Sequence, residues 1–432
     1  MPISVAIVGS GPAGFYVADA LLKAGRDTEI DILERLPAPF GLIGYGIAPD
    51  HQTTKNIART FGQTLAGKHV RYFGNVEVGR DIGLAELREL YDAVILAVGA
   101  PRDRALPIPG IDKQGVIGAT AFVGWYNGHP DFQALNPDLD VSSVAVIGNG
   151  NVAIDVARVL VKTPAEMVAS DLPGYAARAI HGSPLRDVRM FGRRGPVQAN
   201  FTNVELREMG NLEACVPIVD PAQIPQAVPD GMADRDRRLK EKNLATLRDF
   251  IGRDPASRAK RVHFQFFAAP QEVLGYGRVR GLRLERTRLE EGRAVGTGAL
   301  FDVCCGLVVY AIGNAASPLD GAPFDADRAI IANVDGRVGD GLYAVGWAMR
   351  DPVGVISTNR RDAVMVAKDI AADISAGDKP GRPALEQLLA ARGVRRIDFA
   401  EWGKIGAAEI ANATPGAPRR KFLSRQDMLD VL

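Results

Sequence analysis

The sequence contains few of the residues that carry disulfide, metal and nucleophilic chemistry. Its 432 residues include only three cysteines and five histidines. So few cysteines exclude a disulfide scaffold and a cysteine-ligated iron–sulfur cluster within the chain. No Cys-x-x-Cys pair occurs, which excludes a redox-active dithiol of that spacing. We interpret the adjacent Cys304 and Cys305 as core residues of a strand, and we predict neither a metal site nor a Ser-His-Asp triad.

An excess of charge and long apolar runs are lacking as well. Lys and Arg number 52 against 51 Asp and Glu, so the net charge of +1 gives no argument for nucleic acid or a membrane surface as a partner. No apolar stretch reaches the roughly 18 residues that a transmembrane helix needs. A strand is predicted to start at residue 3, which leaves no room for a leader sequence. We therefore expect a cytoplasmic bacterial protein, or an organelle-matrix protein from which a leader was removed.

What is present is a glycine fingerprint directly after the first predicted strand. The apolar residues 3–8 lead into Gly9-Ser10-Gly11-Pro12-Ala13-Gly14, a helix is predicted over residues 15–24, and Glu34 closes the next apolar run. Glu34 stands about twenty residues after the last glycine, as in dinucleotide-binding sites. The glycines allow the backbone to approach a pyrophosphate, and the start of the helix offers N–H groups to it. Glu34 can accept hydrogen bonds from a ribose, so this site fits the adenosine half of FAD or NAD.

A second fingerprint, Gly148-Asn149-Gly150-Asn151-Val152-Ala153, follows the apolar residues 144–147. The next predicted strand, residues 188–191, ends in Gly192-Arg193-Arg194. A carboxylate here would repel a 2′-phosphate, whereas arginine binds one in bidentate fashion. An insertion, residues 163–186, lengthens the usual spacing, and a solvated basic turn is the alternative interpretation. We predict NADP at this site, and two dinucleotide sites indicate electron transfer between them.

The alternation of apolar runs and helical stretches predicts an α/β fold with parallel sheets. The strands that end at Gly99 and Gly313 are the expected crossover points. We predict two nested Rossmann-like, three-layer dinucleotide-binding domains. The FAD-binding domain is discontinuous and covers residues 1–102 and 318–432, and the NADP-binding domain covers residues 103–317.

Four segments carry a family resemblance. They are residues 40–51 (FGLIGYGIAPDH), 148–153 (GNGNVA), 192–196 (GRRGP) and 346–356 (GWAMRDPVGVI). They resemble the adrenodoxin reductase family, the NADPH–ferredoxin reductases of mitochondrial and actinobacterial type. The resemblance extends from residue 3 to about residue 425, and it implies a glutathione reductase-like flavoprotein architecture, FAD and NADP(H) as cofactors, and a monomer.

The resemblance also implies site residues, position by position. FAD would contact Gly9, Gly11, Ala13, Gly14, Glu34, Leu42, Val78, Trp347, Gly354, Val355 and Ile356. NADP would contact Arg104, Asn149, Gly150, Asn151, Val152, Arg193, Arg194, Glu205 and Gly354. His51 and Glu208 look like the proton-relay pair of the family, and a structural hydrogen-bonding role is the alternative for His51.

A ferredoxin- or adrenodoxin-like iron–sulfur protein is the electron partner that the resemblance implies. Such proteins are acidic, so a basic patch is expected on the reductase. The candidate residues lie in a segment whose leucines suit a helix, and they are Arg235, Arg237, Arg238, Lys240 and Lys242. A solvated helix face is the alternative interpretation of this segment.

The leading functional prediction is therefore an FAD-dependent NADPH:ferredoxin oxidoreductase. An NADPH-dependent flavin monooxygenase or small-molecule reductase is the alternative on the same scaffold, and it would need an apolar substrate pocket over the flavin. A non-catalytic subunit would be expected to lack a fingerprint glycine or Gly354, and these glycines are present.

Overall fold

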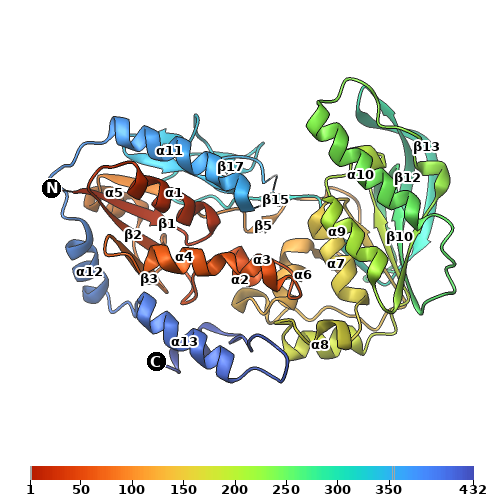
Figure 1. Ribbon diagram of the computed structural model, residues 1–432, viewed down its shortest axis with the longest axis horizontal. Helices are drawn as coiled ribbons and strands as arrows, with labels where there is room; N and C mark the ends of the chain where they lie inside the picture. The colour runs from red at the N-terminus through yellow and green to blue at the C-terminus, as the bar shows by residue number, and fades with distance from the viewer. Residues whose placement is uncertain (1, 353, 355) are drawn as a thin grey trace. The chain divides into compact units, whose positions relative to one another are not determined.

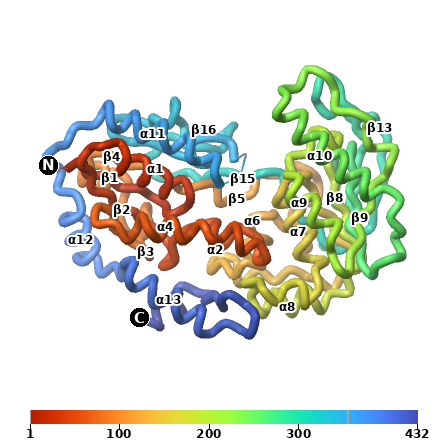
Figure 2. Tube along the Cα trace, viewed as in Figure 1, coloured from red at the N-terminus to blue at the C-terminus, as the bar shows by residue number. Residues whose placement is uncertain are grey.

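The computed structural model describes residues 2–352, 354 and 356–432, so the predicted FAD contact Val355 lies outside the described residues. The chain forms two compact units, each built on a six-stranded sheet. Unit 1 comprises Met1–Arg102, Asn127–Asp131 and Gly313–Leu432, and unit 2 comprises Asp103–Tyr126 and Phe132–Ile312. In Figure 2 the red start and the blue end of the trace accordingly belong to the same unit.

The sheet of unit 1 has the strand order β18-β19-β4-β1-β2-β3, in which only the β18–β19 pair is antiparallel. The strands are β1 (Ile3–Val8), β2 (Thr28–Glu34), β3 (Val70–Gly74), β4 (Ala93–Leu96), β18 (Arg337–Gly339) and β19 (Leu342–Ala344). Aliphatic side chains of β1 and β4 are buried on both faces, as expected for parallel strands between helices. Short pairings are made by β5 (Arg102–Asp103) with β15 (Asn314–Ala315) and by β16 (Phe324–Asp325) with β17 (Ile330–Ile331).

Unit 1 also contains helices, several of which pack on this sheet. They are α1 (Pro12–Lys23), α2 (Leu42–Tyr45), α3 (Gln52–Lys55), α4 (Ile57–Leu65), α5 (Leu84–Leu90), α11 (Asn359–Asp373), α12 (Gly381–Ala391), α13 (Phe399–Ala411) and α14 (Arg425–Leu429). Helices α1 and α11 pack against each other, and Figure 1 shows them side by side although they are far apart in the sequence. The first helix and the C-terminal part of the chain therefore share one core.

The sheet of unit 2 is parallel throughout, with the order β6-β14-β7-β8-β10-β9. Its strands are β6 (Val116–Gly118), β7 (Ser143–Ile147), β8 (Asp187–Phe191), β9 (Cys215–Val219), β10 (Lys260–Gln265) and β14 (Leu307–Tyr310). An antiparallel sheet is added by β11 (Ala268–Leu274), β12 (Gly281–Glu290) and β13 (Arg293–Cys304). The helices are α6 (Ala119–Tyr126), α7 (Asn151–Val161), α8 (Gly174–His181), α9 (Asn203–Glu208) and α10 (Asp234–Phe250). None of the helices in the described part of the chain is both long and apolar enough to cross a membrane.

The chain passes from unit 1 into unit 2 after Arg102, contributes Asn127–Asp131 to unit 1, and returns to unit 1 for good at Gly313. Two hydrogen bonds within unit 1 hold these crossing segments together. The Arg102 guanidinium donates to the Ala316 carbonyl at 2.7 Å, and the Asn314 side-chain amide donates to the Ala100 carbonyl at 3.2 Å. We refer to this pair of bonds as the crossover clip.

The α/β fold with parallel sheets is confirmed, and local boundaries differ from the predicted ones. Helix α1 begins at Pro12 instead of residue 15, because proline is accommodated at a helix start, where its missing N–H is not needed. Unit 1 resumes at Gly313 instead of residue 318. The interpretation of both adjacent cysteines as core residues is wrong for Cys304, which is exposed at the end of edge strand β13, whereas Cys305 is buried.

Candidate nucleotide sites

The glycine turn of unit 1 contains two glycines that the fold requires and one that it does not. Gly9 has φ +110°, and a Cβ there would lie 2.5 Å from the Ala97 carbonyl oxygen. A Cβ on Gly14 would lie 2.3 Å from the Gly9 carbonyl oxygen. At Gly11, by contrast, no heavy atom of the described residues lies within 4 Å of the Cβ position. The turn is therefore closed on its inner side and open at Gly11, where α1 presents its N-terminus.

Glu34 lies beside this turn at the end of β2 and is held there by three hydrogen bonds. Its Oε2 accepts from the Ser10 backbone N–H at 3.1 Å and from the Ser10 hydroxyl at 2.7 Å, and its Oε1 accepts from the Leu36 N–H at 3.2 Å. Ser10 is fully buried. Sequence reasoning identified Glu34 but missed Ser10, whose only signal is a small hydroxyl between the first two glycines.

A second turn, residues 40–42, packs against the glycine turn. Phe40 has φ +81°, a strained value for a residue with a side chain, and its N–H donates to the Ser10 carbonyl at 3.1 Å. A Cβ on Gly41 would lie 3.2 Å from the Gly11 Cα. The predicted FAD residue Leu42 follows as the first residue of α2 and is 44% exposed. The open side of the glycine turn therefore has Gly41 packed close to Gly11, and Leu42 follows Gly41 along the chain.

The turn that contains Trp347 packs on the start of α1. Gly346 has φ +68°, and a Cβ on it would lie 2.6 Å from the Ala13 Cβ. The buried Trp347 Nε1 finds no hydrogen-bond partner among the residues that the structure describes. A buried indole N–H normally has an acceptor, so this orphaned donor indicates a place for a polar ligand atom. Unit 1 thus brings Ala13 against the turn that contains Trp347, although these two predicted FAD residues are far apart in sequence.

The remaining predicted FAD residues of unit 1 have ordinary surroundings. Val78 and Ile356 are partly buried and pack against the hydrophobic core. Gly354 has φ +103°, and a Cβ on it would lie 2.6 Å from the Thr358 Cγ2. Glycine is therefore required at residue 354 by its local fold, apart from any role toward a ligand.

The glycine turn of unit 2 resembles that of unit 1, with a closely packed first glycine and an open middle glycine. Gly148 has φ +146°, and a Cβ on it would lie 2.3 Å from the Ala311 carbonyl oxygen. At Gly150 no heavy atom of the described residues lies within 4 Å of the Cβ position, and α7 starts at the next residue. Val152, in the first turn of α7, is exposed. This site is also open at its middle glycine.

The loop around Asn149 is held by its neighbours. The Asn149 carbonyl accepts from the Asn200 N–H at 2.8 Å, and the Asn151 side chain accepts from the Thr202 N–H at 2.7 Å. The Asn149 side chain lies against Gly192, where a Cβ would be only 1.7 Å from the amide nitrogen. The Asn149 Oδ1 is buried without a hydrogen-bond partner among the described residues, so it offers an acceptor at the site.

The arginine pair follows β8 and has a fixed backbone. The Arg193 carbonyl accepts from the Thr287 hydroxyl at 2.7 Å, and the Arg194 carbonyl accepts from the Phe267 N–H at 3.3 Å. Arg193 is exposed and Arg194 is half-buried. These bonds fix the backbone of the arginine pair. Arg104, also predicted to contact NADP, is half-buried just after β5.

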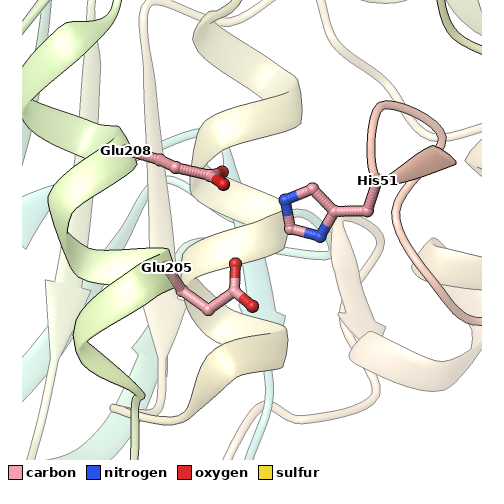
Figure 3. A group of neighbouring side chains, drawn as sticks. All are labelled: His51, Glu205 and Glu208. Atoms are coloured by element: carbon pink, nitrogen blue, oxygen red, sulfur yellow. The ribbon is translucent and has the colours of Figure 1, made fainter. Parts of the chain in front are cut away.

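Glu205 and Glu208 project from one side of α9, as Figure 3 shows. A fully buried arginine of α7, Arg158, lies between them and Asp155. Its Nη1 is 2.8 Å from Asp155 Oδ1, 3.3 Å from Glu208 Oε2 and 3.6 Å from Glu205 Oε2. A buried guanidinium must be paired, and here it fixes the positions of both glutamates. Sequence reasoning missed Arg158. His51, labelled in the same figure, precedes α3 in unit 1 and is half-buried.

The predicted basic patch on α10 is divided by the structure. Arg235, Arg238 and Lys242 are exposed. The Arg237 Nη2 lies 3.3 Å from Asp230 Oδ1 and also donates to the Pro229 carbonyl. Lys240 is half-buried, and its Nζ donates to the Ala199 carbonyl at 2.5 Å. The five cations therefore do not form one surface.

The cysteines are unsuited to thiolate chemistry. Burial raises the pKa of Cys215 to about 12 and that of Cys305 to about 12. A thiol is reactive as its thiolate, so both buried cysteines are inert near neutral pH.

Comparison with known proteins places these sites in a family. The pyridine nucleotide-disulphide oxidoreductase family matches residues 3–172. The chain is 43% identical to human mitochondrial NADPH:adrenodoxin oxidoreductase over 99% of this chain and 91% of that protein. It is 39% identical to the NADPH-ferredoxin reductase FprA of Mycobacterium tuberculosis over 100% of this chain and 99% of the relative.

The chain belongs to the adrenodoxin reductase family. The solved structure of M. tuberculosis FprA in complex with NADPH has the same fold, with a TM-score of 0.93 and 38% identity over 100% of this chain and 99% of that one. The family resemblance stated from the sequence motifs is therefore confirmed. The chain contains no Cys-x-x-Cys pair.

Proposed function

We propose that this protein is an FAD-dependent NADPH:ferredoxin oxidoreductase. It exchanges electrons singly with a ferredoxin- or adrenodoxin-like iron–sulfur protein. The observation that carries the proposal is the pair of glycine turns, one in each unit and each open at its middle glycine, with Glu34 beside one and the arginine pair beside the other. FAD, when bound, supplies the chemistry that couples a hydride from NADPH to single-electron transfer.

The residues of unit 1 fit FAD. The N-terminus of α1 and the open position at Gly11 suit the pyrophosphate, and Glu34 suits a ribose. Ala13, Leu42, Val78, Trp347, Gly354 and Ile356 complete the proposed contacts, and the orphaned Trp347 N–H supplies a donor. Gly9 and Gly14 keep the turn closed beneath the nucleotide.

The residues of unit 2 fit NADP(H). Residues 149–152 would contact the pyrophosphate, and the guanidinium groups of Arg193 and Arg194 would bind the 2′-phosphate. Arg104 and Glu205 are further proposed contacts. We propose His51 and Glu208 as the proton-relay pair, with Arg158 holding the glutamate in place. Both cofactors bind through backbone and charge, so the chain needs no nucleophile of its own.

An anaerobic titration tests the proposed function directly. The purified protein is titrated with NADPH and, separately, with NADH, while the visible absorbance of the flavin is followed. We expect bleaching at near-stoichiometric NADPH and a much poorer response to NADH, because only NADPH has the 2′-phosphate that the arginine pair recognises. A colourless protein, or a yellow one that responds to neither nucleotide, would contradict the proposal.

The exposed cations of α10 provide the proposed ferredoxin-docking face, defined as Arg235, Arg238 and Lys242. Electrostatic complementarity to an acidic partner raises the association rate and is screened by salt. Changing Arg235 and Arg238 to Glu is expected to raise the KM for ferredoxin about tenfold or more at low salt, and less at high salt. Reduction of a small artificial dye by NADPH should be unchanged. A parallel fall in both activities would show that these arginines act elsewhere.

A further inference from the structure

Lys240 does not lie on the ferredoxin-docking face of α10. Its side of the helix packs on residues 199–203, because Asn243 donates to the Phe201 carbonyl at 3.1 Å and Asn203 donates to the Thr246 hydroxyl at 2.9 Å. The Lys240 Nζ continues this row of contacts with its bond to the Ala199 carbonyl at 2.5 Å. The lysine is therefore fixed on the inner side of α10, whereas Lys242 is exposed.

Ala199 ends a compact turn that begins at the arginine pair. After Arg194 the chain forms the short 3-10 helix η3 (Pro196–Gln198), in which the Gln198 N–H donates to the Gly195 carbonyl at 3.1 Å. The Ala199 N–H donates to the Pro196 carbonyl at 3.3 Å, so the turn folds back on itself. The ammonium group of Lys240 is thus attached to the same turn that carries both arginines.

The charges around Lys240 are consistent with its attachment to this turn. Burial lowers the pKa of Lys240, and the positive charge of Arg194 lowers it further, while Asp236 opposes the shift. An ammonium group has three N–H donors, and the Ala199 carbonyl accepts one of them. Like charges held near each other repel, and an anion with several acceptor oxygens placed at them relieves that repulsion. The 2′-phosphate of NADP(H) is such an anion.

We infer that Lys240 is a specificity-determining residue for the 2′-phosphate of NADP(H), that it acts together with Arg193 and Arg194, and that it is not part of the ferredoxin-docking face. This inference rests on the proposed function. It assigns neighbouring cations of one helix to two different ligands, with Lys240 serving the nucleotide and Lys242 serving the protein partner.

The test uses the flavin-loaded full chain and two matched variants, Lys240→Met and Lys242→Met. Binding of 2′,5′-ADP, which carries the 2′-phosphate, and of 5′-AMP, which lacks it, is measured by calorimetry. Lys240→Met is expected to weaken 2′,5′-ADP binding about 10- to 100-fold, as for loss of a charge-assisted contact, and to leave 5′-AMP binding unchanged. Lys242→Met should bind both nucleotides as the unmodified protein does. Lys240→Arg, which keeps the charge, should recover most of the affinity.

The outcomes separate this inference from the proposed function. If the unmodified protein binds both nucleotides alike, the proposed NADP preference itself is wrong. If it prefers 2′,5′-ADP and Lys240→Met keeps that preference in full, only the role of Lys240 is wrong. An equal loss for both nucleotides, with a lower melting temperature, would show that Lys240 is structural. A higher KM for ferredoxin in Lys240→Met with normal 2′,5′-ADP binding would return the residue to the docking face.

Discussion

Replacing both Arg193 and Arg194 with alanine is expected to remove most of the preference for NADPH over NADH. Each charge-assisted contact to a phosphate contributes roughly 1.5–3 kcal/mol, so loss of both corresponds to about 10²- to 10⁴-fold weaker NADPH binding. Because Arg193 is exposed, we expect the lower part of this range. NADH has no 2′-phosphate, so its binding should barely change.

The dissociation constants of NADP⁺ and NAD⁺, measured on the flavin-loaded protein, check this result. Arg288→Ala provides the control, because Arg288 is an exposed arginine of the same unit that lies 2.7 Å from Glu290. Its removal should change neither constant. An equal loss of affinity for both nucleotides in the double variant would place the arginine pair away from the 2′-phosphate.

Gly11→Ala is expected to give a folded protein that does not retain FAD. The new methyl group would meet no heavy atom of the described residues within 4 Å, so the fold should tolerate it. It would instead occupy the space through which the backbone approaches the pyrophosphate. Overpacking of this kind costs about 1–3 kcal/mol or more, so FAD affinity should fall about fivefold at the least and more than 100-fold at the upper end. The ratio of visible to ultraviolet absorbance after purification, together with circular dichroism, measures both parts of the prediction.

Gly14→Ala is the contrasting variant in the same turn. Its methyl group would lie 2.3 Å from the Gly9 carbonyl oxygen, so the turn itself must distort and the melting temperature should fall. Gly150→Ala tests the equivalent open position of unit 2 and should weaken NADP⁺ binding while FAD is retained. A Gly11→Ala protein that keeps its flavin through dialysis would show that the pyrophosphate does not lie at this turn.

The sequence was sufficient to predict those features of the candidate sites that depend on residues close together along the chain. The strands before Gly9 and Gly148 are aliphatic runs, and the glycines that follow them permit the turns, so the two glycine turns could be predicted without coordinates. Glu34 could be predicted because it closes the strand that follows α1. These features are local, and local patterns determine them.

Features that depend on packing between distant segments could not be predicted in this way. Ser10 was missed because its role toward Glu34 arises only when β1 and β2 pair. Arg158 was missed because the glutamates that it meets belong to another helix.

The division of the α10 cations had a signal that was not used. Lys240 stands at positions i and i+4 with Leu244, which is buried, so both belong to one side of the helix. The five cations were grouped as one patch by their closeness in sequence. Helical periodicity instead places Lys240 on the inner side of α10 and Arg235, Arg238 and Lys242 on the exposed side.

The crossover clip has a consequence for how such a chain can be lengthened or recombined. The bonds at Ala100 and Ala316 hold together the segments of unit 1 between which most of unit 2 is inserted, so along the chain unit 2 takes the place of a long loop of unit 1. The entropic cost of closing a loop grows only slowly with its length. A complete folded domain can therefore be inserted at the crossover clip with little loss of stability in unit 1. The clip is therefore a natural splice point for chimaeras. A domain that replaces unit 2 must keep Asn127–Asp131, because this segment belongs to unit 1. There Arg35 Nη1 lies 2.5 Å from Asp131 Oδ2.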